Sequence, residues 1–191
     1  MKRTLHAAHA GAKLCGMADP ESLAADCAVP PPVASALHVA DGEVLSRVGP
    51  MFVQLTNGLC SGGTHVALLT DSAEMVARLQ GTPVECHRVA HLRGWRAWGL
   101  FERLAGRFTP PPDIIHVWDG AGLRGVQHWS VNSGVPVVAH VLSTHGLQGL
   151  LRGGLEGTEC VVAGSKMLAD EFIKGAPHAA RSCRTIVRGI A

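Results

Sequence analysis

The sequence has no apolar run that approaches the ~20 residues a membrane-spanning helix requires. It also has no concentration of positive charge, because its 17 Lys and Arg residues are scattered along the chain and 15 Asp and Glu residues nearly balance them. A dedicated nucleic-acid binder is usually far more basic, so nucleic acid is not expected as a partner. Hydrophobic residues make up 47% of the 191 residues, which is too many for a disordered chain.

Paired cysteines and a secretion signal are also missing. The six cysteines form no C-x-x-C pair, and their wide, irregular spacing is not that of a disulfide framework. Near the amino terminus, His6, His9 and Lys13 interrupt the apolar stretch that a signal peptide would need. We therefore expect a reduced, cytoplasmic protein whose cysteines are Cys15, Cys27, Cys60, Cys86, Cys160 and Cys183.

Several short motifs are absent as well. The chain contains neither G-x-G-x-x-G nor G-x-x-x-x-G-K-[ST], so dinucleotide binding and Walker-type nucleotide binding lose support. It also lacks the G-x-S-x-G of serine hydrolases. Cys86, His87 and His91 are too few for a zinc site, and a strand would send Cys86 and His87 to opposite faces. No metal is expected.

The chain divides at its proline-rich stretch. Asp19 and Pro20 have the character of a helix start, and Pro30–Pro32 favours an extended segment. We assign residues 1–33 to an appendage or linker and residues 34–191 to one domain.

From residue 34 onward, apolar strand patterns alternate with helical ones. The strands are almost continuously apolar, which is typical of parallel sheets that helices cover on both faces. We expect a doubly wound, Rossmann-like α/β/α sandwich in a single domain. In the helix that begins near Val44, Pro50 predicts a kink or a division, and Asn57-Gly58 predicts the end. Strands are expected at 36–39, 65–69, 84–89, 113–118, 135–142, 159–163 and 184–187, and helices at 44–55, 75–79, 95–104, 123–131, 147–151 and 166–174.

Ligands of such folds bind beyond the carboxyl ends of the strands. After the first strand, Gly42 lies between Asp41 and Glu43, which makes a poor phosphate loop and favours simple capping of the next helix. After the fourth strand, the carboxylate of Asp119, followed by Gly120, could accept a hydrogen bond from a sugar hydroxyl; the alternative is an ordinary turn.

Two later loops carry further candidates. His145 follows Ser143 and Thr144, and a histidine beside two hydroxyls could hold a sugar hydroxyl or act as a base. The alternative is that His145 is a loop histidine that caps the next helix. Ser165 lies in the corresponding loop after the sixth strand. His116, within the fourth strand, is expected to be buried beside the sheet.

The segments ALHVADGE, THVALLTD, PPDIIHVWD, GVPVVAHVLST, ECVVAGSKMLADEF and RTIVRGIA, in this order, resemble the amino-terminal half of family 4 glycosyltransferases, which have the two-domain GT-B architecture. The resemblance implies an acceptor-side domain for a carbohydrate or glycolipid. It also implies a nucleotide-sugar donor bound mainly by a carboxyl-terminal domain, retaining hexosyl transfer, and no cofactor or metal in this chain.

The sequence departs from that family in four places. The first loop keeps one glycine, Gly42, where the family usually has a pair. Leu142 occupies the family's histidine position, and His145 lies three residues later. The family's paired glutamates are absent. At the usual crossing into the second domain, only Gly189 and Ile190 match.

We therefore expect a chain that is inactive alone. Its catalytic candidate is His145, and its substrate-binding candidates are Asp41, Gly42, Asp119, Gly120, Ser143, Thr144 and Ser165. Two alternatives stay open: a non-enzymatic Rossmann-like binding module, and part of a sugar-nucleotide epimerase-type enzyme. A membrane surface has little support, since the nearest approach to a basic amphipathic helix is Arg93, Arg96 and Arg103 with Trp95, Trp98 and Phe101.

Overall fold

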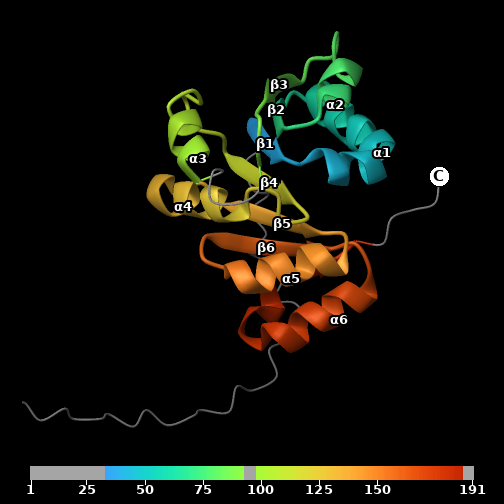
Figure 1. Ribbon diagram of the computed structural model, residues 1–191, viewed down its shortest axis with the longest axis vertical. Coiled ribbons are helices and arrows are strands. Elements are labelled where there is room, and N and C mark those ends of the chain that lie inside the picture. The colour runs from blue at the N-terminus through green and yellow to red at the C-terminus, as the bar shows by residue number, and fades with distance from the viewer. Residues whose placement is uncertain (1–32, 93–97, 187–191) are drawn as a thin grey trace, which may run out of the picture. The chain divides into compact units, whose positions relative to one another are not determined.

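Strands and helices alternate along the chain, as the sequence predicts (Figure 1). The computed structural model describes residues 33–92 and 98–186. In those ranges the elements are β1 (Ser35–Val39), α1 (Gly42–Ser61), β2 (His65–Thr70), α2 (Ala73–Arg78), β3 (Glu85–Arg88), α3 (Trp98–Ala105), β4 (Ile114–Trp118), α4 (Leu123–Ser133), β5 (Val137–Val141), α5 (Thr144–Gly153), β6 (Thr158–Ala163), α6 (Lys166–Gly175), the 3-10 helix η3 (Pro177–Ser182) and β7 (Cys183–Thr185).

The seven strands within the described residues form one parallel sheet in the order β3-β2-β1-β4-β5-β6-β7. In register, Leu37 of β1 lies between Ala67 of β2 and Ile115 of β4. The strand order reverses between β1 and β4, which makes their carboxyl ends the topological switch point where doubly wound folds bind ligands. The predicted Rossmann-like α/β class is therefore confirmed.

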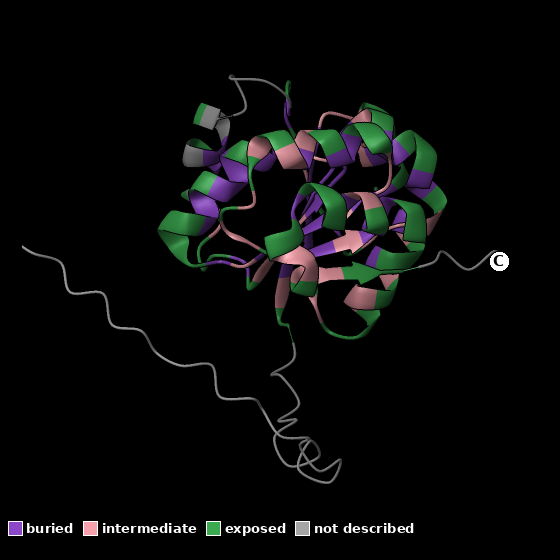
Figure 2. Cartoon of the chain, turned by 90° about the horizontal axis from the view of Figure 1, so that it is seen from below, coloured by how far each residue is buried: buried purple, intermediate pink, exposed green. Residues whose placement is uncertain are grey.

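Helices cover both faces of the sheet. Ala67 and Leu69 of β2 face one buried cluster, to which α3, α4, α5 and α6 contribute. Val66 and Leu68 face the opposite cluster, which α1 and α2 cover. Figure 2 shows the buried positions on the strands and on the inner sides of the helices. Burial on both faces explains why the strands are continuous apolar runs.

Helix α1 differs from its prediction. It is one helix of 20 residues that continues through Pro50 and past Asn57-Gly58 to Ser61. Phe52 and Thr56, which follow the proline in the helix, are fully buried. Pro50 is exposed, so its ring points to solvent while the opposite face packs on the sheet. The burial of that face outweighs the one backbone hydrogen bond that proline removes.

The other expected elements are present, with ends displaced by a few residues, and η3 was not predicted. The expected helix start at Asp19 and Pro20, the extended segment at 30–32 and Trp95 lie outside the described residues. The domain limits 1–33 and 34–191 stay predictions. No helix in the described ranges combines the length and apolar character needed to cross a bilayer.

Candidate functional site

Four helices begin at the carboxyl edge of the sheet with a side chain that caps them. The Oδ1 of Asp41 accepts a hydrogen bond from the Val44 amide at 2.9 Å in α1. Ser143 Oγ accepts from the Gly146 amide at 3.0 Å in α5, and Ser165 caps α6 in the same way. Ser72 caps α2. Asp41 thus lies at the positive end of α1, as expected, whereas the cap of α5 is Ser143 and not His145. Part of the hydrogen-bonding capacity of Asp41 and Ser143 serves the fold.

Carboxylates of the chain itself surround the first loop. Asp41 is only 3% exposed, and the Gly42 amide donates to Asp71 Oδ1 at 2.7 Å. Glu43 adds a third carboxylate in the first turn of α1. Because the positive end of α1 already faces three negative groups, a phosphate there would meet repulsion and occupied donors. This geometry agrees with the expectation that the loop is a poor phosphate cradle.

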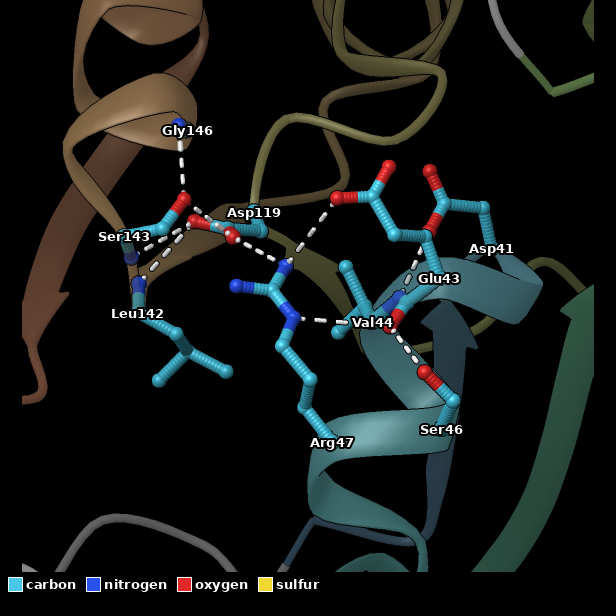
Figure 3. Close-up of polar contacts among 9 residues, drawn as sticks. All are labelled: Asp41, Glu43, Val44, Ser46, Arg47, Asp119, Leu142, Ser143 and Gly146. Carbon is cyan, nitrogen blue, oxygen red and sulfur yellow. Dashed lines mark hydrogen bonds and ion pairs between the residues drawn. The ribbon is translucent and has the colours of Figure 1, made fainter.

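Asp119 is the centre of the polar contacts at the switch point (Figure 3). Its side chain is 2% exposed. Its Oδ1 accepts from the amides of Leu142 and Ser143 at 3.0 and 3.1 Å. Its Oδ2 accepts from Ser143 Oγ at 2.6 Å and from Arg47 Nη2 at 2.9 Å. One carboxylate therefore fixes the ends of β4 and β5 and the first turns of α1 relative to one another.

The backbone around Asp119 is shaped to allow this. Asp119 has a φ of 53°, in the left-handed region that Asp tolerates better than most residues, and Gly120 follows with a φ of 78°. Gly146 lies against the carboxylate so closely that a Cβ at this position would overlap with it. Glycine at 146 is thus needed for the close approach of α5 to Asp119.

Arg47 is a member of this site that the sequence analysis did not identify. Its side chain is 43% exposed, its Nε donates to the Glu43 carbonyl at 3.4 Å, and its Nη2 lies 3.8 Å from Glu43 Oε1. Its Nη1 makes no contact with any residue drawn in Figure 3. The available sequence signal was its position one helical turn after Glu43, just beyond the first strand.

Exposure separates the candidates into two groups. Asp41 and Asp119 are buried, so a sugar hydroxyl could reach the Asp119 carboxylate only by displacing a donor of the chain. Thr144 and His145, in the first turn of α5, are exposed; Gly42, Gly120, Ser143 and Ser165 are half-buried. The groups that solvent reaches most easily at the switch point are thus Glu43, Arg47, Thr144 and His145.

Three histidines meet on the α1 face of the sheet. His38 of β1 stacks on His116 of β4 with ring centroids 4.8 Å apart, and His116 Nδ1 lies 2.8 Å from His140 Nε2 of β5. Trp118 stacks on His140 and donates from Nε1 to His38 Nδ1 at 3.1 Å. Desolvation lowers the pKa of His116 to about 4 and that of His140 to about 3, and it also lowers the pKa of His38 well below its usual value.

The positions of the histidines and of Cys86 also bear on metal binding. His116 was expected to be buried, but it is half-buried, and its ring stacks on His38 on the α1 face of the sheet. Cys86 packs with the α1 face, whereas His87 contacts Phe108 beside the opposite cluster, so the two point apart as predicted. In the part of the chain that the structure describes, no group of three or more His, Cys, Asp or Glu residues is arranged to hold a metal ion.

Comparison with solved structures gives the fold a context. The chain is similar to a glycosyltransferase from Rickettsia africae ESF-5, with a TM-score of 0.66 and 13% identity over 83% of this chain and 44% of the other. It is also similar to Anabaena Alr3699/HepE in complex with UDP and glucose, with a TM-score of 0.62 and 14% identity over 82% of this chain and 45% of the other. The UDP-glucose complex of Alr3699/HepE matches with a TM-score of 0.60 at 11% identity.

Neither a scan against models of protein families nor a search of curated proteins gave a match. At these identities the structural likeness shows the fold alone. The chain spans less than half the length of these solved structures.

Proposed function

We propose that this chain is the acceptor-side half of a nucleotide-sugar-dependent glycosyltransferase of the GT-B architecture, related to family 4. The observation that carries the proposal is the match of 83% of this chain to 44% of a glycosyltransferase, and of 82% of it to 45% of Alr3699/HepE. One of those proteins holds UDP-glucose. The other half of such an enzyme would bind the donor, and the reaction would take place between the two.

In this proposal the carboxyl edge of the sheet faces the reaction. Asp119 and Gly146 keep the loops after β4 and β5 in one fixed arrangement, which supports catalysis by orientation. Ser143, Thr144 and the exposed His145 contact acceptor hydroxyls, with His145 as the candidate to take up a proton from the attacking hydroxyl. Hexosyl transfer with retention of configuration follows from the resemblance.

In this proposal Arg47 binds the anion that the first loop cannot bind. Because carboxylates occupy the α1 N-terminus, the guanidinium of Arg47 supplies positive charge at the switch point, where charge develops on a leaving diphosphate. Asp119 holds its Nη2, and no hydrogen bond or ion pair is drawn from its Nη1 to the other residues of Figure 3. This placement suits a charge-assisted hydrogen bond to an anion.

The test begins with the purified chain. It is incubated with UDP-glucose and a panel of carbohydrate acceptors, and acceptor binding is followed residue by residue with amide NMR shifts. We expect no sugar transfer by this chain alone, together with saturable acceptor shifts near Arg47, Gly120 and His145. His178→Gln, an exposed substitution on η3, serves as a control that should leave these shifts unchanged.

Three outcomes would contradict the proposal. Efficient transfer by the isolated chain would refute its dependence on a second half. Conversion of a free nucleotide sugar without acceptor would favour the epimerase-type alternative. Absence of any carbohydrate binding at these residues, together with no α/β domain encoded after residue 191 in the gene, would favour a non-enzymatic binding module.

A further inference from the structure

A second site lies away from the switch point, between the edge strand β3 and the second half of α3. A cavity of about 470 Å³ opens there, which is within the range of small-molecule sites. Its floor is apolar, with Val89 and Leu104 both buried. Three arginines, Arg88, Arg103 and Arg107, also line it, together with Cys86 and His87.

The charge of this cavity is not compensated by its own lining. None of the described residues that line it is Asp or Glu. The acidic side chain of β3, Glu85, is engaged by two histidines: its Oε1 lies 2.8 Å from His87 Nε2, and its Oε2 lies 3.3 Å from His65 Nε2. Three like charges around one cavity repel each other, and a bound anion removes that cost.

The arginines are held on a rigid base. Phe101 and Leu104 fix α3 in the core, and Arg103 Nε donates to the Gly99 carbonyl at 3.0 Å, which orients its guanidinium. The Arg107 amide donates to the Leu104 carbonyl at 2.8 Å. On the other side, β3 is the edge of the sheet and presents backbone groups that no further strand in the described residues pairs.

We infer that this cavity binds a phosphate group carried by the acceptor. Guanidinium groups recognise phosphate oxygens with paired hydrogen bonds, and Arg103 and Arg107, on the α3 side of the cavity, can supply them. Only β2 separates β3 from β1, so the cavity lies roughly 10 Å along the edge from the switch point, within reach of a phosphorylated sugar or a phospholipid headgroup. Naming the ligand an acceptor rests on the proposed function.

Glucose 6-phosphate is the probe, with glucose as its uncharged match, and binding to the complete chain is followed by NMR of amide and Arg Nε–H groups. We expect saturable shifts at 86–90 and 103–107 with the phosphate and none with glucose. Combined substitution of Arg88, Arg103 and Arg107 by Gln should weaken binding at least tenfold, roughly the loss of several charge-assisted hydrogen bonds.

Arg152→Gln is the matched control. Arg152 is exposed on α5 and donates from Nε to the Gln148 carbonyl at 3.2 Å, as Arg103 does to Gly99, but it lies outside the cavity. It should change binding by less than about twofold, since a helix-surface charge elsewhere contributes little. Urea unfolding of every variant checks folding, and because all four arginines are exposed, we expect unchanged midpoints.

Vesicles of phosphatidylcholine, with and without phosphatidylglycerol, distinguish the two sources of phosphate. Binding that requires the anionic lipid and is lost in the triple variant assigns the site to a headgroup; sugar-phosphate binding without vesicle binding assigns it to a soluble acceptor. Equal shifts with glucose, or an equal loss in Arg152→Gln, would overturn the inference. Phosphate binding at this cavity needs no donor half. It can therefore be observed even if the experiments on sugar transfer fail, and sugar transfer can be observed even if the cavity binds no phosphate.

Discussion

The carboxylate of Asp119 occupies the space into which a side chain at position 146 would extend. The two residues come from loops that follow adjacent strands, β4 and β5, and the contact brings the first turn of α5 onto the end of β4. The edge of the sheet where the fold is expected to bind ligands is therefore built around the carboxylate of Asp119 and around Gly146, which has no side chain.

Gly146→Ala should destabilise the protein by at least about 2 kcal/mol, because the new methyl overlaps with a buried carboxylate and forces apart its hydrogen bonds. Gly149→Ala, one turn later in α5, is the control, since nothing lies within 4 Å of its added Cβ. That change should be neutral or stabilise by up to about 1 kcal/mol through helix propensity. Urea unfolding of both variants gives the comparison, and equal stabilities would disprove the close contact.

Asp119→Ala should cost about 2–4 kcal/mol, because it leaves the amides of Leu142 and Ser143 and the guanidinium of Arg47 without their buried acceptor. Asp119→Asn keeps one acceptor oxygen and tolerates the left-handed backbone, so we expect about half that loss. Denaturant midpoints of the two variants test this order. If Asn were as damaging as Ala, the charge rather than the hydrogen bonds to the loop would dominate.

The strands and caps of this fold are predictable from sequence because their causes are local. Burial on both faces makes a strand such as β2 a continuous apolar run from Val66 to Leu69, and Ser72 and Ser143 stand where helices begin. The continuity of α1 through Pro50 was not predictable in this way, because the burial of Phe52 that maintains the helix is a tertiary effect.

The site itself was predictable only in part. The parallel fold places Asp119 and Ser143 at one edge, as the sequence analysis expects, but their hydrogen bond depends on the register of β4 and β5. Arg47 and Asp119 are 72 residues apart, and no local pattern links them. The stacking of His38 on His116 likewise requires the pairing of β1 with β4, which periodicity alone does not give.

The histidine cluster should make stability fall with acidification. The pKa values of folded His116 and His140, about 4 and about 3, lie below the ordinary value near 6.5, so the unfolded chain binds protons first as the pH falls. Each histidine then adds a slope of up to about 1.4 kcal/mol per pH unit between roughly pH 6 and pH 4, and above pH 7 the effect vanishes.

Urea unfolding between pH 7.5 and 4.5, about one unit above and two units below the ordinary histidine pKa, measures that slope. His140→Phe keeps an aromatic ring against Trp118 but cannot take up a proton, so its stability should fall less steeply with pH than that of the wild type. His178→Gln, on the exposed surface of η3, should leave the wild-type slope unchanged. Identical slopes for the wild type and His140→Phe would show that His140 does not contribute.

Arg47→Ala should lower the activity of the enzyme much more than it lowers the stability of the fold. Asp119 retains three donors without Arg47, and a half-exposed ion pair contributes little, so we expect a loss of no more than about 1 kcal/mol in urea unfolding. In an active enzyme that contains this chain, kcat/KM should nevertheless fall at least about tenfold, since the proposed contact to the leaving diphosphate is removed. Arg78→Ala is the matched control, because Arg78 forms an exposed ion pair with Glu74 at 3.0 Å on α2. If both variants kept full kcat/KM, Arg47 would serve only to position Asp119, and the positive charge at the switch point would have to come from the other half of the enzyme.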